Sequence, residues 1–97
     1  MSRALLERRL NELTGRLRTL RGELAVVDEQ LAQLVDDAGE ARIRSLVSET
    51  PLADQEHREA ARQAEAMTRH RATLTAKLEQ LERGQDELLD QLIATKS

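Results

Sequence analysis

Cysteine and all three aromatic residues are absent from this sequence, and its 97 residues include one proline and four glycines. The lack of cysteine excludes disulfide bonds, thiol catalysis and thiolate metal sites. Without Phe, Trp or Tyr, apolar contacts must come from Leu, Val, Ile, Ala and Met, which suit a narrow seam between helices better than a thick globular core. The composition therefore favours paired helices, and the length favours a single domain over residues 1–97.

Long apolar runs and an excess of one charge are lacking as well. No run approaches the length of a signal-peptide core or a membrane span, so we expect a cytoplasmic protein that has no membrane partner. The 15 basic and 18 acidic residues are interspersed and leave a net charge of −3. Such a balance attracts nucleic acid weakly, and no aromatic side chain can stack on bases. Nucleic acid is therefore not an expected partner.

Leucines and one valine recur near the start of the chain at alternating spacings of four and three residues. They are Leu6, Leu10, Leu13, Leu17, Leu20, Leu24, Val27, Leu31 and Leu34. This alternation is the heptad pattern of a helix that pairs with one other helix. It predicts a first helix over about residues 3–38.

A second helix is predicted over about residues 51–94. Thr50 and Pro51 are typical of a helix start, because a threonine hydroxyl can cap free backbone N–H groups and proline fits the first helical position. One row of its heptad pattern contains only apolar residues, whereas every second residue of the other row is polar. The apolar row is Ala53, Ala60, Met67, Leu74, Leu81 and Leu88.

An antiparallel arrangement with its turn at residues 48–51 places the two seams opposite each other, so that Leu17 faces Leu81. In this register three polar residues enter the seam: Gln85 opposite Leu13, Arg71 opposite Val27 and His57 opposite Ala41. They weaken the seam but penalise shifted alignments, of which a slip by one heptad is the main alternative. The predicted fold class is all-α, a long antiparallel coiled-coil helical hairpin.

Two helices alone bury little surface, so we expect the hairpin to form a homodimer, as a four-helix assembly, or to bind a larger protein. Candidate contacts for this additional layer include Leu5 of the first helix and several residues of the second helix. On the second helix they are Ala61, Thr68 and Thr75 along one flank, and Leu89 and Ile93 near the chain ends.

The row of large seam residues stops before Gly39, and a helix continued beyond that point would turn Ile43, Leu46 and Val47 away from the seam. We therefore predict a tip segment, residues 39–50, in which the first helix ends or bends near Gly39. A short helix would then fold these three side chains over the start of the second helix. The alternative is an apolar tip that is exposed for a partner.

Asp36, Asp37 and Glu40 cluster where the first helix is expected to meet this tip. Three neighbouring acids can bind a divalent cation, but solvated acids at a helix end are commoner, so neither a metal nor a cofactor is predicted. A coiled-coil hairpin with an acidic tip resembles, over residues 36–62, the N-terminal hairpin of the Gre-type transcript cleavage factors. This sequence has no counterpart of the second, globular domain of that family. The resemblance implies an alternative function, a transcription-associated factor that presents the acidic tip to RNA polymerase.

The sequence contains no nucleophile elbow, glycine-rich phosphate loop or catalytic carboxylate pair, so no catalytic or cofactor-binding residue is predicted. An enzyme built at a dimer interface would require Arg71 to be buried beside further charged groups. The preferred hypothesis is a structural or protein–protein interaction module without catalytic activity. We expect it to bind a protein partner through the tip or through the flank that contains Ala61.

Overall fold

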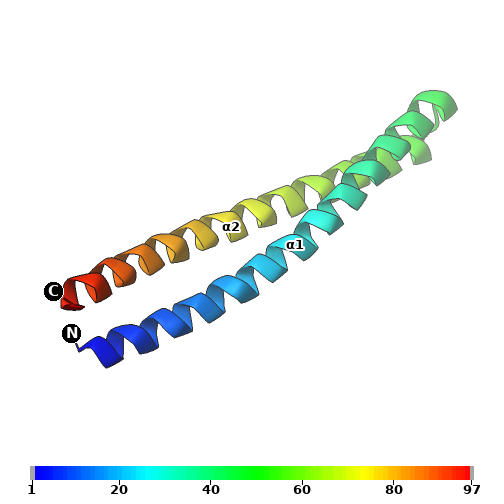
Figure 1. Cartoon of the computed structure of the whole chain (residues 1–97). Coiled ribbons are helices and arrows are strands. Elements are labelled where there is room, and N and C mark those ends of the chain that lie inside the picture. Colours follow the sequence, from blue (N-terminus) through cyan, green and yellow to red (C-terminus); the bar gives the residue numbers. More distant parts are fainter. Residues whose placement is uncertain (1, 97) are drawn as a thin grey trace. The chain divides into compact units, whose positions relative to one another are not determined.

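The computed structural model describes residues 2–96 and contains two helices of 46 residues each (Figure 1). Helix α1 extends over Arg3–Ser48 and helix α2 over Pro51–Lys96. The predicted all-α helical hairpin is confirmed. The chain divides into two compact units, each of which contains a part of both helices. Unit 1 holds residues 2–24 and 74–96, and unit 2 holds Ala25–Thr73 with the turn.

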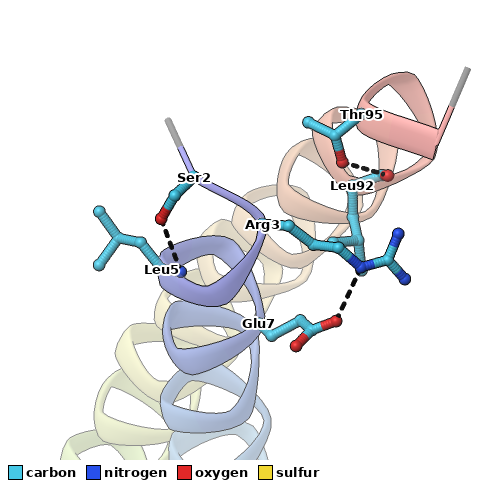
Figure 2. Close-up of polar contacts among 6 residues, drawn as sticks. All are labelled: Ser2, Arg3, Leu5, Glu7, Leu92 and Thr95. Atoms are coloured by element: carbon cyan, nitrogen blue, oxygen red, sulfur yellow. Dashed lines mark hydrogen bonds and ion pairs between the residues drawn. The ribbon is translucent and has the colours of Figure 1, made fainter.

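Hydroxyl groups form hydrogen bonds with the backbone near both helix ends in unit 1 (Figure 2). Ser2 Oγ accepts a hydrogen bond of 3.2 Å from the backbone N–H of Leu5 in the first turn of α1. Near the end of α2, the Thr95 hydroxyl donates to the Leu92 carbonyl over 2.8 Å. The Leu5 N–H is one of the groups that a helix start would otherwise leave to water, so Ser2 caps α1.

Two residues, Glu49 and Thr50, connect the helices in unit 2. Thr50 Oγ1 accepts a hydrogen bond of 3.2 Å from the N–H of Ala53, which confirms the predicted cap of the second helix. Glu49 closes α1 by donating its N–H to the Ser45 carbonyl over 3.1 Å, and its φ of 52° lies in the left-handed region. The left-handed conformation ends α1 at Glu49. A glutamate adopts this conformation only at a cost in free energy.

Burial along α1 follows the predicted heptad pattern. All nine predicted seam residues are buried or half-buried, and Leu6 and Leu17 are the most completely enclosed, with exposed fractions of 1% and 0%. The same alternation then continues beyond Leu34 through Ala38, Ala41 and Ser45. The seam is therefore longer than the row of large residues from which it was predicted.

The predicted end or bend of the first helix near Gly39 is wrong, because α1 continues without a break to Ser48. Ala38 and Ala41 keep the helix packed against α2 after the leucines end, and one glycine in a helix interior costs only about 1 kcal/mol relative to alanine. The predicted tip segment, residues 39–50, thus consists of the last turns of α1 and the two-residue connection. The second helix also ends slightly later than predicted, at Lys96.

Contacts between the helices identify their register within each unit. In unit 1, Gln85 Nε2 donates to Thr14 Oγ1 over 3.3 Å, and a Cβ atom placed on Gly84 would lie 3.4 Å from Cδ2 of Leu13. Since Leu13 is the predicted neighbour of Gln85, the predicted register is confirmed there, and a slip by one heptad is excluded. In unit 2, Arg71 pairs with Asp28, the residue that follows its predicted neighbour Val27.

Candidate interaction surface

Four large apolar side chains are exposed around the turn of unit 2. The exposed fractions are 62% for Ile43, 65% for Leu46, 80% for Val47 and 65% for Leu52. The first three are spaced i, i+3 and i+4 near the end of α1, so they share one face of that helix. Leu52 lies in the first turn of α2. We call these four residues the apolar tip.

The apolar tip is exposed because small residues fill the seam beside it. Ala41 and Ala53 are buried, with exposed fractions of 3% and 8%, and their short side chains allow a close approach of the two helices. The heptad phase then directs Ile43 away from α2. The predicted short helix that covers the second helix is therefore wrong, and the alternative, an exposed apolar tip, is the arrangement found.

The outward side of α1 in unit 2 carries a row of residues four positions apart, which forms one ridge of a helix surface. The row consists of Val35, Gly39, Ile43 and Val47, and we call it the outer row. Val35 is 55% exposed, and a Cβ atom on Gly39 would meet nothing within 4 Å. Within the part of the chain that the structure describes, no residue covers this row.

The acids Asp36, Asp37 and Glu40 are exposed and lie within α1, not at its end. Glu40 is eight residues before the last residue of the helix, a distance of about 12 Å along its axis. The expected acidic tip is therefore wrong in position, since the end of the hairpin carries apolar side chains. Among residues 2–96, no three His, Cys, Asp or Glu side chains gather in a way that could hold a metal ion.

None of the candidate contacts on α2 belongs to the apolar tip. Leu89 and Ile93 are exposed, by 39% and 67%, and belong to unit 1. Ala61 belongs to unit 2 and is half-buried. Sequence reasoning missed Leu52, although a large apolar residue directly after Pro51 and outside both seam rows is the signal that could have identified it.

Arg71 lies at the surface of unit 2, where its side chain is 42% exposed and pairs with Asp28. The hydrogen bond that Arg71 Nε donates to Asp28, together with the attraction between the two charges, raises the pKa of Arg71 above its ordinary value. An exposed pair of opposite charges stabilises the contact between the helices.

An open groove of about 760 Å³ lies between the helices of unit 1. Its rim includes Glu12, Arg16, Glu23 and Lys77, so charges of both signs alternate around it. This mixture provides no convergent set of groups for one charged ligand. The apolar tip and the outer row are therefore the candidate site.

Comparisons with models of protein families, with curated proteins and with solved structures found no match for this chain. Neither of the two helices, over the described residues, contains an apolar stretch sufficient to cross a lipid bilayer.

Proposed function

We propose that this chain is a protein–protein interaction module without catalytic activity, and that it binds its partner through the apolar tip. The exposure of Ile43, Leu46, Val47 and Leu52 at one end of unit 2 is the observation that carries this proposal. Helices that bind in grooves of other proteins present anchors spaced i, i+3 and i+4. Clustered apolar side chains on a small protein also mark interaction sites more often than scattered ones do.

Polar residues near the tip form contacts within α2. These contacts stabilise the helix, so the polar residues do not compete with the apolar tip as the proposed binding surface. Arg58 pairs with Asp54 one turn earlier in α2 over 2.6 Å, and Thr50 caps the same helix. Both contacts stabilise the first turns of α2. The most prominent feature around the turn is its uncovered apolar surface.

A homodimer in the cytoplasm remains part of this proposal. Among the described residues, Leu6 and Leu17 are the largest side chains that are completely buried. A two-helix protein with so small a core gains stability from a second surface that buries further apolar groups. The apolar tip offers such groups.

The alternative function, an acidic tip presented to RNA polymerase, gains no support from this geometry. Its three acids lie about 12 Å or more before the end of α1. The end of the hairpin is apolar, so we do not favour this alternative.

Site-specific photo-crosslinking tests the proposed function in cells that express the full chain. A photoreactive amino acid at Val47, the most exposed large apolar residue, should form a defined adduct with another protein molecule. The same amino acid at Val26 is the matched control, because Val26 is 53% exposed on the same helix but lies outside the apolar tip. Adding Leu46→Asp should remove the adduct at position 47. Equal adducts from both positions, or none from position 47, would contradict the proposal.

A further inference from the structure

We infer that Met67 of α2 is a site of reversible oxidation, at which a peroxide converts the thioether into a sulfoxide and weakens the pairing of the helices in unit 2. This inference goes beyond the proposed function, because it concerns a chemical modification of the seam. It does not depend on which partner the apolar tip binds.

Met67 is the one large apolar residue that α2 contributes to the seam of unit 2. The structure describes all of residues 51–73, and the six residues at seam positions there are buried or half-buried. Three of the six are alanines and two carry polar groups. The six are Ala53, His57, Ala60, Ala64, Met67 and Arg71. The packing of α2 against α1 in this unit therefore depends strongly on a single thioether side chain.

The side chain of Met67 is also accessible to small molecules. It is half-buried, and together with Leu34 of α1 it lines an open pocket of about 340 Å³. Gln63, Ala66 and His70 form the remainder of the wall. A water molecule takes up about 30 Å³, so a molecule as small as hydrogen peroxide fits into this pocket. Met67 thus packs in the seam and is open to an oxidant at the same time.

The rest of the chain offers few competing targets for a peroxide. Thiolates and thioethers are the side chains that peroxides oxidise most readily, and the chain has no cysteine and two methionines. Tryptophan and tyrosine are absent as well. Met1 lies outside the described residues. Among residues 2–96, sulfur occurs at position 67 alone, so oxidation by a peroxide is directed to the seam of unit 2.

The oxidation requires a peroxide as its co-reactant. A lone pair of the Met67 sulfur attacks one peroxide oxygen, so that an S–O bond forms and the O–O bond breaks. The proton on the transferred oxygen passes to the departing hydroxide, which leaves as water. The sulfur loses two electrons and the peroxide gains them. A methionine sulfoxide reductase reverses the step with a dithiol, which becomes a disulfide while the sulfoxide oxygen leaves as water.

The sulfoxide weakens the seam because it places a polar S–O group where an apolar side chain packs. The side chain of Leu34, which lines the same pocket, has no hydrogen-bond donor for the new oxygen. The oxygen therefore either remains in the seam without a partner there or turns toward solvent and carries the side chain out of the seam. Both arrangements remove the apolar contact that Met67 provides.

Treatment of the full-length chain with hydrogen peroxide tests whether the site reacts in the folded protein. Mass spectrometry of the proteolytic peptide that contains Met67 should show one added oxygen. The rate in the native chain should lie within about tenfold of the rate in urea, because a half-buried side chain in an open pocket is only partly protected. A native chain in which Met67 resists oxidation, while the unfolded chain reacts, would overturn the inference.

Urea unfolding of the oxidised chain tests the effect on helix pairing. Oxidation should raise the equilibrium constant of unfolding by about tenfold or more, and a methionine sulfoxide reductase should restore the original value. Met67→Leu is the matched control, because leucine keeps an apolar side chain of similar volume while Met1 is retained. Peroxide should leave the midpoint of this variant unchanged. An unchanged midpoint of the oxidised native sequence, or an equal shift in the variant, would contradict the proposed site.

Hydrogen exchange measured by mass spectrometry locates the effect. In the oxidised chain, amides of residues 53–73 in unit 2 should exchange about tenfold faster than in the untreated chain. Amides of residues 76–92 in unit 1 should change less, since their seam contains leucines and no sulfur. Equal acceleration in both segments would show that oxidation does not act on the seam of unit 2 and would overturn the inference.

Discussion

Replacing Gly15 and Gly22 of α1 with alanine should stabilise unit 1 by about 2 kcal/mol. A Cβ atom at either position would meet nothing within 4 Å, so neither substitution displaces a neighbour. Each exchange removes the cost of a glycine in a helix interior, about 0.8–1.0 kcal/mol. The two sites are two helical turns apart and share no partner, so their effects should add.

Gly84 of α2 provides the comparison. Its Cβ would lie 3.4 Å from Cδ2 of Leu13, an ordinary contact that adds a little packing. Gly84→Ala should therefore gain about as much as either exposed site, provided that the Leu13 side chain does not have to move. A smaller gain at Gly84 than at Gly15 would show that this contact is already tight.

Urea unfolding followed by circular dichroism at 222 nm measures the effect, with all variants at one protein concentration. The Gly15→Ala, Gly22→Ala double variant should have a higher midpoint and an unchanged dependence on urea. In a thermal scan, about 2 kcal/mol corresponds to a rise of roughly 8–16 °C for a domain of this size. An unchanged or lower midpoint would refute the reasoning, because it would mean that a backbone or partner needs the space beside these glycines.

Substitutions at four further positions test the seam and the turn. Leu17→Ala should lower the free energy of unfolding by about 2–5 kcal/mol, because Leu17 is fully buried. Leu52→Ala, at an exposed position, should change the free energy of unfolding by less than about 0.5 kcal/mol. Both are measured by urea unfolding. Thr50→Ala removes the hydroxyl that caps α2 and should cost about 1 kcal/mol in the same assay, with Thr50→Ser retaining most of the stability. Glu49→Gly should raise the thermal midpoint, because glycine adopts the left-handed conformation without strain, and Glu49→Val should lower it.

The sequence predicted the parts of the fold that large residues specify. Leucines spaced four and three apart define the seam of α1, and Thr50 followed by Pro51 marks the start of α2. The contacts of Gln85 with Thr14 and of Asp28 with Arg71 agree with the register that follows from these signals. Each of these features depends on residues that either gain much free energy from burial or cap the end of a helix.

The end of the hairpin was predicted less well, because small residues give a weak signal. Ala38, Ala41 and Ser45 continue the seam. Alanine and serine also occur on exposed surfaces, so these residues do not mark the seam beyond Gly39 as clearly as the leucines mark it before. The predicted helix end near Gly39 displaced the acids to that end and assigned Ile43 to a covering role. The structure reverses both, since a continuous helix leaves the acids in its interior and the large side chains outside.

The two-residue connection also bears on whether a chain folds back on itself or exchanges a helix with another copy. If α1 and α2 joined into one helix, two chains could pair over their whole length, and contacts such as Thr14 with Gln85 would form between chains as readily as within one. Pro51 opposes this exchange, because within a continuous helix its ring would clash with the carbonyl of Val47 and its nitrogen could not donate a hydrogen bond. The left-handed residue Glu49 reverses the chain direction at the same place. Pro51 thus acts against domain swapping, and Pro51→Ala is the substitution most suited to release it.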